Sequence, residues 1–391
     1  MRIMHISTRL ILGGSQENTI LSCEGQADAG HEVSLLFGPI TGPEGSLRPT
    51  VDANPSIEAI ETPNLCRELA PRRDFTCRRD LAKVIRRWRP DVVHTHSSKA
   101  GILGRAAAWA AQVPAVVHTI HGLPFHPYQG SIRNRIYIQA ERWAARRCHA
   151  IVTVADAMRD QALAVGIGRP NQYSTIRSGM RVEPYLEHEE STTDARTRLG
   201  LPKDAFIVGT IARLAELKGH DDLLDGLGPL LQKDHKMHLL WVGDGYWAER
   251  LRRRTEELGL ASQVHFSGLV DPGDIPSWIR TMDVVAHPSY REGLPRAVVQ
   301  GMLSGRPVIS YALDGAPEVC IDDVTGILVQ PGDLVGLRTA VGRLREDSTL
   351  RHRLGDEGRR RCRTAFDWRT MVHELQSLYE NLLDAGDRRH P

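Results

Sequence analysis

Apolar and polar residues alternate along the chain in a pattern that predicts two sets of β-strands separated by helices. Short apolar runs rich in β-branched residues recur between longer stretches whose apolar residues have helical spacing. The runs are 3–6, 32–37, 91–96, 115–120 and 150–154, followed by 206–211, 237–242, 264–267, 284–287, 307–310 and 327–329. Strands that alternate with helices form βαβ units and parallel sheets, so the pattern predicts an α/β protein with two domains.

The same pattern predicts the domain boundaries. Apolar residues become scarce at 184–198, where Glu, Thr and Asp dominate, as is typical of a linker. We therefore expect a Rossmann-like domain at 1–183 and a second one at 199–365. The stretch 366–391 has apolar residues at helical spacing, and we expect it to form a helix that crosses back to the N-terminal domain. In such sheets ligands bind beyond the carboxyl ends of the strands, so a cleft between the two domains is the expected place for chemistry.

Composition narrows the possible functions. The 50 Lys and Arg residues nearly balance 48 Asp and Glu, which argues against nucleic acid as a partner, although the part through Tyr185 is basic and the rest is acidic. The six cysteines lack the spacing of a zinc site and favour reduced thiols in the cytoplasm. The N-terminus is typical of a first strand rather than a signal peptide, and no apolar run approaches the roughly 18 residues of a membrane span. We expect any membrane contact to be peripheral.

Two strand-to-helix loops contain candidate phosphate ligands. Gly13 and Gly14 follow the first strand, where glycine lets the backbone approach a ligand and a helix N-terminus favours an anion; a plain tight turn is the alternative. Arg213 and Lys218 lie between a strand and a helix that begins near His220. Two cations at a helix N-terminus can neutralise a diphosphate without a metal, whereas the alternative is a solvated charged loop.

Two other segments resemble a cofactor site and a metal site, but each has a simpler explanation. Gly243, Gly245 and Ala248 match a dinucleotide-binding pattern, but they lie in the second domain beside a bulky tryptophan, and a plain strand-to-helix turn fits equally well. His94 and His96 have a spacing that suggests zinc. We expect their side chains to point to opposite sides of a buried strand, with no third ligand nearby in the sequence, so we predict no metal site.

The densest group of candidate residues follows the strand 284–287. Glu292 stands at the entrance of a helix expected at about 296–304, where a carboxylate can accept hydrogen bonds from sugar hydroxyls or simply cap the helix. The backbone N–H groups of Gly293 and Leu294 face an anion there. Gln300, on the inner side of the helix, can both donate and accept hydrogen bonds.

Together these segments resemble the retaining nucleotide-sugar glycosyltransferases of the GT-B fold, specifically family 4. The similarity covers nearly the whole chain, through GGSQE, DVVHTHSSKAGILGR, VVHTIHG, VTVADAM, GTIARLAELKG, WVGDG, VHFSGLV and the REGLP loop. It implies that an N-terminal, acceptor-side domain faces a C-terminal domain that binds the nucleotide sugar, and that no metal or other cofactor takes part. The resemblance also implies a role for each candidate residue. The Gly14 amide would bind phosphate, Arg213 and Lys218 would clamp the diphosphate, and the backbone at Val270 would recognise the base. Glu292 would bind the sugar, the amides of Gly293 and Leu294 would help to hold phosphate and sugar, and His121 would approach the reaction centre.

The chain departs from the family at one position. Family members have a second glutamate eight positions after the first, and this chain has Gln300 there. That glutamate grips the ribose in the family, so we expect weaker or altered ribose binding with the chemistry retained. Two alternatives stay open: a nucleotide-sugar epimerase on the same fold, and a degenerate protein that only binds a nucleotide sugar.

Two basic stretches, 67–89 and 131–147, complete the prediction. Aromatic and aliphatic residues alternate with arginines in both, which suits a helix on an anionic membrane surface or, alternatively, a helix whose apolar stripe faces the core. We therefore expect a cytoplasmic enzyme at the inner face of the cell membrane. It would move a hexose or N-acetylhexosamine from a nucleoside-diphosphate sugar, with UDP as the expected nucleotide, to a lipid-linked or polysaccharide acceptor with retention of configuration.

Overall fold

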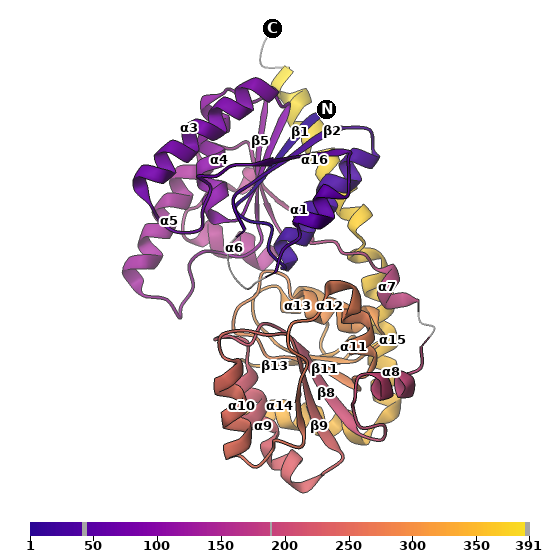
Figure 1. The fold of residues 1–391 in the computed structure, drawn as a ribbon. Helices are drawn as coiled ribbons and strands as arrows, with labels where there is room; N and C mark the ends of the chain where they lie inside the picture. Colours follow the sequence, from indigo (N-terminus) through magenta and orange to yellow (C-terminus); the bar gives the residue numbers. More distant parts are fainter. Residues whose placement is uncertain (41–44, 188–189, 388–391) are drawn as a thin grey trace. The chain divides into compact units, whose positions relative to one another are not determined.

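The computed structural model describes residues 1–40, 45–187 and 190–387 and divides the chain into two compact units (Figure 1). The first unit comprises Met1–Met180 and Asp367–Pro391, and the second comprises Arg181–Phe366. Each contains one parallel sheet with helices, which confirms the predicted α/β class with two Rossmann-like domains.

The first unit contains a seven-stranded sheet in the order β3-β2-β1-β4-β5-β6-β7. Its strands are β1 (Arg2–Ser7), β2 (Glu32–Phe37), β3 (Ile57–Glu61), β4 (Val92–His96), β5 (Ala115–Ile120), β6 (Ala150–Thr153) and β7 (Tyr173–Thr175). Its helices are α1 (Gly14–Asp28), α2 (Arg48–Asp52), α3 (Pro71–Trp88), α4 (Ser98–Ala110), α5 (Ser131–Ala145), α6 (Asp156–Ala164), the 3₁₀ helix η1 (Pro170–Gln172) and α16 (Trp368–Asp387).

The second unit contains a six-stranded sheet in the order β10-β9-β8-β11-β12-β13. Its strands are β8 (Phe206–Ile211), β9 (Met237–Val242), β10 (Val264–Phe266), β11 (Val284–His287), β12 (Val308–Tyr311) and β13 (Ile327–Val329). Its helices are α7 (Glu183–Leu186), α8 (Thr192–Arg198), α9 (His220–Lys233), α10 (Ala248–Glu257), the 3₁₀ helix η2 (Pro272–Asp274), α11 (Ile275–Arg280), α12 (Arg296–Leu303), α13 (Ala316–Val319), α14 (Leu334–Glu346) and α15 (Ser348–Ala365).

The eleven predicted strands all form, with bounds that shift by one residue at most. They are recognisable because most of their residues are buried on both faces of a helix-covered sheet, which gives continuous apolar runs. The prediction missed β3 and β7. Both are edge strands, β3 has three exposed residues and β7 has only three residues, so neither leaves an apolar run.

Helix α16 belongs to the first unit although it follows the second in the sequence. Met371, Val372 and Leu375 pack into the core that contains strand residues of β1 and β5. In Figure 1 the yellow α16 lies beside the indigo α1. The approach is close because Gly25 of α1 has no side chain: a Cβ there would lie 2.7 Å from Trp368. Residues 388–391 of the predicted terminal helix lie outside the described residues.

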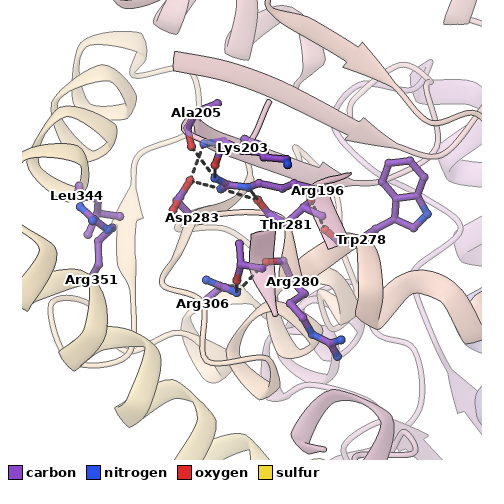
Figure 2. Close-up of polar contacts among 12 residues, drawn as sticks. Arg196, Lys203, Ala205, Trp278, Arg280, Thr281, Asp283, Arg306, Leu344 and Arg351 are labelled. Atoms are coloured by element: carbon purple, nitrogen blue, oxygen red, sulfur yellow. Dashed lines mark hydrogen bonds and ion pairs between the residues drawn. The ribbon is translucent and has the colours of Figure 1, made fainter. Parts of the chain in front are cut away.

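The segment 184–198, expected as a linker, contains α7 and α8 and is part of the second unit; residues 188–189 lie outside the described chain. Figure 2 shows how a buried Arg196 fixes α8. Its guanidinium donates to the carbonyls of Lys203 and Ala205, to Thr281 O at 2.8 and 3.0 Å, and to Asp283 Oδ2 at 2.8 Å. Polar contacts replace an apolar face here, which explains why the sequence looks like a linker.

The described part of the chain offers no helix long and apolar enough to cross a membrane.

Candidate functional site

The second unit gathers four loops at the carboxyl edge of its sheet, around the point where strand order reverses. β8 lies between β9, which is the next strand in the sequence, and β11, which comes two strands later. Parallel sheets of this kind bind ligands at such a switch point. The loops after β8, β9, β10 and β11 carry Lys218, Gly243, Val270 and Glu292 respectively. The topology therefore brings the residues predicted for donor binding in this unit to one edge.

The loops after β8 and β11 are fastened to each other. The backbone N–H of Tyr290 donates to Leu217 O at 2.9 Å, and Ser289 Oγ donates to the same oxygen at 3.2 Å. Leu217 and Gly219 both have positive φ angles, 64° and 75°. A Cβ at Gly219 would lie 2.0 Å from the carbonyl oxygen of Pro288, so only glycine permits this approach. Lys218 is thereby held beside the loop that contains Glu292.

Glu292 forms the centre of a charged cluster. Its Oε1 accepts hydrogen bonds from Lys218 Nζ at 2.6 Å and from His287 Nε2 at 2.9 Å. Its backbone N–H donates to Asp314 Oδ2, in the loop after β12, at 2.9 Å. Burial alone would raise the pKa of Glu292, but the Lys218 ammonium and His287 outweigh it and hold the pKa below its usual value. The carboxylate is therefore ionised and acts only as a hydrogen-bond acceptor.

Arg213, on the same loop as Lys218, is exposed. Within the described residues its side chain makes no hydrogen bond or ion pair. A guanidinium in this position is available to an incoming anion, because no internal partner has to be displaced.

The glycines of the GDG turn have a packing explanation. A Cβ at Gly243 would lie 2.3 Å from Ala212 O, and one at Gly245 would lie 2.3 Å from Leu214 O. Trp247 N also donates to Leu214 O, at 2.9 Å. The turn after β9 thus supports the loop that carries Arg213, and its glycines need no dinucleotide to explain them.

Helix α12 begins at Arg296, directly after Gly293, the buried Leu294 and Pro295. Four residues into the helix, Gln300 is half-buried, and its Nε2 donates to Tyr185 Oη at 2.8 Å. Its Oε1 has no hydrogen-bond partner within 1–40, 45–187 and 190–387. The amide nitrogen is therefore committed to α7, while the oxygen can still accept a hydrogen bond as a glutamate would.

In the first unit the sheet reverses its order between β1 and β4. Gly14 begins α1 just beyond β1, and the half-buried His121 follows β5 directly. His121 Nε2 lies 3.1 Å from Nδ1 of His96 on β4. The roles expected for Gly14 and His121 stay predictions.

The prediction that His94 and His96 point to opposite sides of their strand is wrong. Their ring centroids are 4.3 Å apart because residues two positions apart share one face of a strand. His5 of β1 joins them, and one ring nitrogen from each of the three lies within 4.8 Å of the others. The third histidine was missed because it is 89 residues away in the sequence and is brought close by strand pairing.

The three histidines resemble a metal cluster, but their nitrogens are already engaged. His5 Nδ1 lies 2.9 Å from His96 Nε2, and His5 Nε2 lies 2.7 Å from Gln26 Oε1. Both nitrogens of His94 are bonded, to Tyr379 Oη at 2.5 Å and to Thr119 Oγ1 at 2.7 Å. Nitrogens that share a tetrahedral zinc would be roughly 3.4 Å apart, given Zn–N bonds of about 2.1 Å. The geometry is that of a hydrogen-bond network.

Helix α5 presents apolar side chains to solvent. Ile132 is 77% exposed and Ile136 is 58% exposed, and with Leu69 they line a groove of about 570 Å³. Arg133 and Arg135 on the same helix are also exposed. At Ile132 and Ile136 the structure contradicts the alternative in which the apolar stripe faces the core.

Sequence reasoning missed His287 and Asp314, which contact Glu292, and Tyr185, which contacts Gln300. His287 ends β11 five positions before Glu292, so its place at a strand end was an available signal. Asp314 and Tyr185 left no such signal, because each reaches the site from a separate element.

Two family models match the chain, one in each part. Residues 12–182 match Glycosyltransferase Family 4, and residues 191–361 match Glycosyl transferases group 1.

Curated relatives match over most of the chain. An Escherichia coli UDP-Gal:alpha-D-GlcNAc-diphosphoundecaprenol alpha-1,3-galactosyltransferase is 25% identical over 98% of this chain and 97% of its own length. The putative glycosyltransferase EpsD of Bacillus subtilis is 29% identical over 78% of this chain and 80% of its own.

Solved structures share the fold. Anabaena HepE in complex with UDP-glucose superposes with a TM-score of 0.83 at 21% identity, covering 97% of this chain and 100% of its own. WaaG, a glycosyltransferase involved in lipopolysaccharide biosynthesis, superposes with a TM-score of 0.75 at 16% identity over 96% of this chain and 99% of its own.

Proposed function

Because the chain belongs to the GT-B glycosyltransferases of the family 4 and group 1 type, we propose that it moves a hexose or N-acetylhexosamine from a nucleoside-diphosphate sugar to a lipid-linked or polysaccharide acceptor. The observation that carries the proposal is the cluster of Lys218, Glu292 and His287 at the switch point of the second sheet. It supports the proposal because a cation suited to a diphosphate lies beside an ionised carboxylate suited to sugar hydroxyls.

UDP is the proposed nucleotide. Its support is the similarity to a galactosyltransferase that uses UDP-Gal and the fold shared with HepE, which was solved with UDP-glucose. The same galactosyltransferase acts on a diphosphoundecaprenol-linked sugar, which supports a lipid-linked acceptor here. The backbone at Val270, in the loop after β10, would contact the base.

In the proposed mechanism the second unit stabilises the leaving group. Arg213 and Lys218 neutralise the diphosphate as its charge develops, aided by the amides of Gly293 and Leu294 and, from the first unit, of Gly14. These two cations supply the charge compensation that a metal would otherwise give, so we propose a reaction without metal or other cofactor. Gln300 Oε1 accepts a hydrogen bond from the ribose.

We propose that the sugar keeps its anomeric configuration. The acceptor attacks from the face on which the diphosphate departs, and a diphosphate oxygen takes the acceptor's proton. Glu292 binds sugar hydroxyls in this scheme and is not a covalent nucleophile, since its Oε1 already accepts hydrogen bonds from Lys218 and His287. His121 contacts the sugar from the first unit.

We also propose that the protein works on the cytoplasmic face of the membrane. The support is the exposed pair Ile132 and Ile136 with Arg133 and Arg135 on α5, a combination that suits an anionic lipid surface.

The proposal is tested by sugar transfer from a panel of UDP-hexoses to a polyprenyl-diphosphate-linked sugar. Glu292→Gln keeps the shape of the side chain and removes its charge, so we expect kcat/KM to fall about 100-fold. The matched control is Glu216→Gln, a carboxylate on the loop of Lys218 that is exposed, and it should stay within about twofold of the wild type.

Two outcomes would contradict the proposal. One is an absence of transfer with every sugar and acceptor. The other is conversion of the donor without any acceptor, which would indicate the epimerase alternative. The product's anomeric proton coupling in NMR separates retention from inversion.

A further inference from the structure

A chain of hydrogen bonds runs through the first unit from a buried amide to His121. Gln26 Oε1 lies 2.7 Å from His5 Nε2, His5 Nδ1 lies 2.9 Å from His96 Nε2, and His96 Nδ1 lies 3.1 Å from His121 Nε2. Gln26 and His5 are fully buried, His96 is 2% exposed and His121 is half-buried. The chain therefore leads from the core to the surface at the carboxyl edge of the sheet.

The direction of the chain follows from its buried end. A glutamine oxygen can only accept, so His5 must donate through Nε2–H. A neutral imidazole has one N–H, which leaves His5 Nδ1 as an acceptor and requires His96 to donate through Nε2–H. By the same argument His96 Nδ1 accepts, and His121 must donate through its Nε2–H.

This direction of the hydrogen-bond series requires neutral rings. Protonation of His5 would add an N–H at Nδ1, so His96 and His121 would have to change tautomer to avoid two opposed N–H groups along the 2.9 Å contact. Burial lowers the pKa of His5 to about 4, although the bond to Gln26 acts in the opposite direction. Burial, followed by the neighbouring histidines, lowers the pKa of His96 well below its ordinary value.

The orientation of Gln26 is linked to Tyr379 on α16. The Tyr379 hydroxyl lies 2.5 Å from His94 Nδ1 and 3.4 Å from Gln26 Nε2. When this hydroxyl donates to His94, its oxygen accepts from the amide nitrogen, and the amide oxygen faces His5. A rotated amide would reverse every bond along the chain, so the two directions predict opposite tautomers for His121.

We propose that His5 and His96 are positioning residues that, together with Gln26, hold His121 as the Nε2–H tautomer. His121 Nδ1 is then the nitrogen with the lone pair, so it can accept a hydrogen bond from a sugar hydroxyl and cannot donate one. The assignment of that hydroxyl to the donor sugar rests on the proposed function, whereas the tautomer does not.

The test uses ¹⁵N-histidine-labelled protein and long-range ¹H–¹⁵N NMR, which distinguishes protonated from unprotonated ring nitrogens. His121→Gln identifies the resonances of His121 by their loss. We expect Nε2 of His121 to be protonated and Nδ1 to be unprotonated in the wild type. The reverse pattern in the wild type would overturn the inference.

A second arm breaks the series of hydrogen bonds at His5, which is separated from His121 by His96. His5→Phe retains a ring of similar size but cannot hydrogen-bond, so His121 should become a mixture of tautomers and kcat should fall about tenfold, with the donor KM little changed. The control is His118→Phe on β5, which replaces a similarly buried histidine whose hydrogen-bond partners among the described residues both belong to Thr95. It should leave the His121 resonances as in the wild type.

The outcomes separate this inference from the proposed function. An unchanged His121 pattern in His5→Phe overturns the inference whatever the activity. About one equivalent of tightly bound zinc in the wild type that is absent from His5→Phe also overturns it, because the rings would then be metal ligands. A mixed tautomer with unchanged kcat supports the chain and counts against a role for His121 in sugar transfer.

Discussion

At the scale of single residues, the central feature is the ionised carboxylate of Glu292, which two neighbouring side chains contact. Glu292 is half-buried and remains ionised because Lys218 and His287 both donate to its Oε1. An ionised group with two internal donors is rigid and acts only as an acceptor, which is what recognition of sugar hydroxyls requires. The same contacts join Lys218, which we propose binds the diphosphate, to the residue that we propose binds the sugar.

Gln300 occupies the position at which the sequence predicts a departure from the family pattern, and its substitution gives a direct prediction. Gln300→Glu restores a carboxylate that can accept from Tyr185 Oη and from a ribose hydroxyl, whereas the amide accepts through one oxygen only. We expect the dissociation constant of the UDP-sugar, measured by calorimetry, to fall a few-fold. Tyr185→Phe is the control for the loss of the Tyr185 contact. An unchanged affinity in Gln300→Glu would remove Gln300 from the ribose site.

Residue-level prediction from the sequence reached the residues whose signal lies within a single loop. Lys218 and Glu292 each stand at a strand-to-helix junction, and the structure joins them at 2.6 Å. Their roles in donor binding stay predictions. Asp314, Gln26 and His5 were not found, since their contacts cross the sheet and connect residues far apart in sequence. The faces of His94 and His96 were mistaken although the two-residue period of a strand already determined them.

At the scale of elements, the sheets were predictable and the segments with polar contacts were not. Strands such as β9, whose six residues are all buried, appear in the sequence as unbroken apolar runs. Helix α8 was mistaken for a linker because a buried Arg196, bonded to backbone carbonyls, fixes it in place of an apolar stripe. Buried arginine is rare enough that composition alone favours an exposed segment.

Helix α5 gives a prediction at this scale. We expect the wild type to co-sediment with vesicles that contain phosphatidylglycerol, more strongly at low salt than at high salt. The double substitution Ile132→Asp with Ile136→Asp should weaken vesicle binding about tenfold or more, because two exposed apolar side chains are lost and two negative charges are added.

The control for α5 is Val335→Asp, at a 67% exposed position on α14 in the other unit, which should bind vesicles like the wild type. If the wild type fails to bind at low salt, or the double variant binds equally well, α5 is not a membrane surface.

At the scale of the whole molecule, buried histidines tie stability to pH. Burial lowers the pKa of His5 and of His220 to about 4. Between that value and an ordinary pKa of about 6.5 the unfolded chain binds more protons than the folded one, so the free energy of unfolding rises with pH across this window. The contribution of these two histidines to the free energy of unfolding is complete above about pH 6.5 and is lost as the pH falls toward 4.

His220→Phe tests this dependence. Both ring nitrogens of His220 lack a hydrogen-bond partner in the part of the chain that the structure describes, and the ring packs edge-on against Trp241. Phenylalanine should therefore fit and reduce the pH slope of the unfolding free energy by up to about 1.4 kcal/mol per pH unit. The exposed His352, replaced by Ala, should leave the slope unchanged. An unaltered slope in His220→Phe would show that His220 titrates normally.

The central claim is that the loops at the switch point of the second sheet bind the diphosphate of a nucleotide sugar. The most direct measurement is calorimetric titration of UDP-hexoses into the wild type, Arg213→Ala, Lys218→Ala and the control Lys233→Ala, an exposed lysine at the far end of α9. Arg213 has no hydrogen bond or ion pair with any described residue, so its removal should leave the fold intact. We predict that the wild type and Lys233→Ala bind alike, and that Arg213→Ala and Lys218→Ala each raise the dissociation constant about tenfold or more. Wild-type protein that binds no nucleotide sugar, or clamp variants that bind as tightly as the control, would contradict the claim.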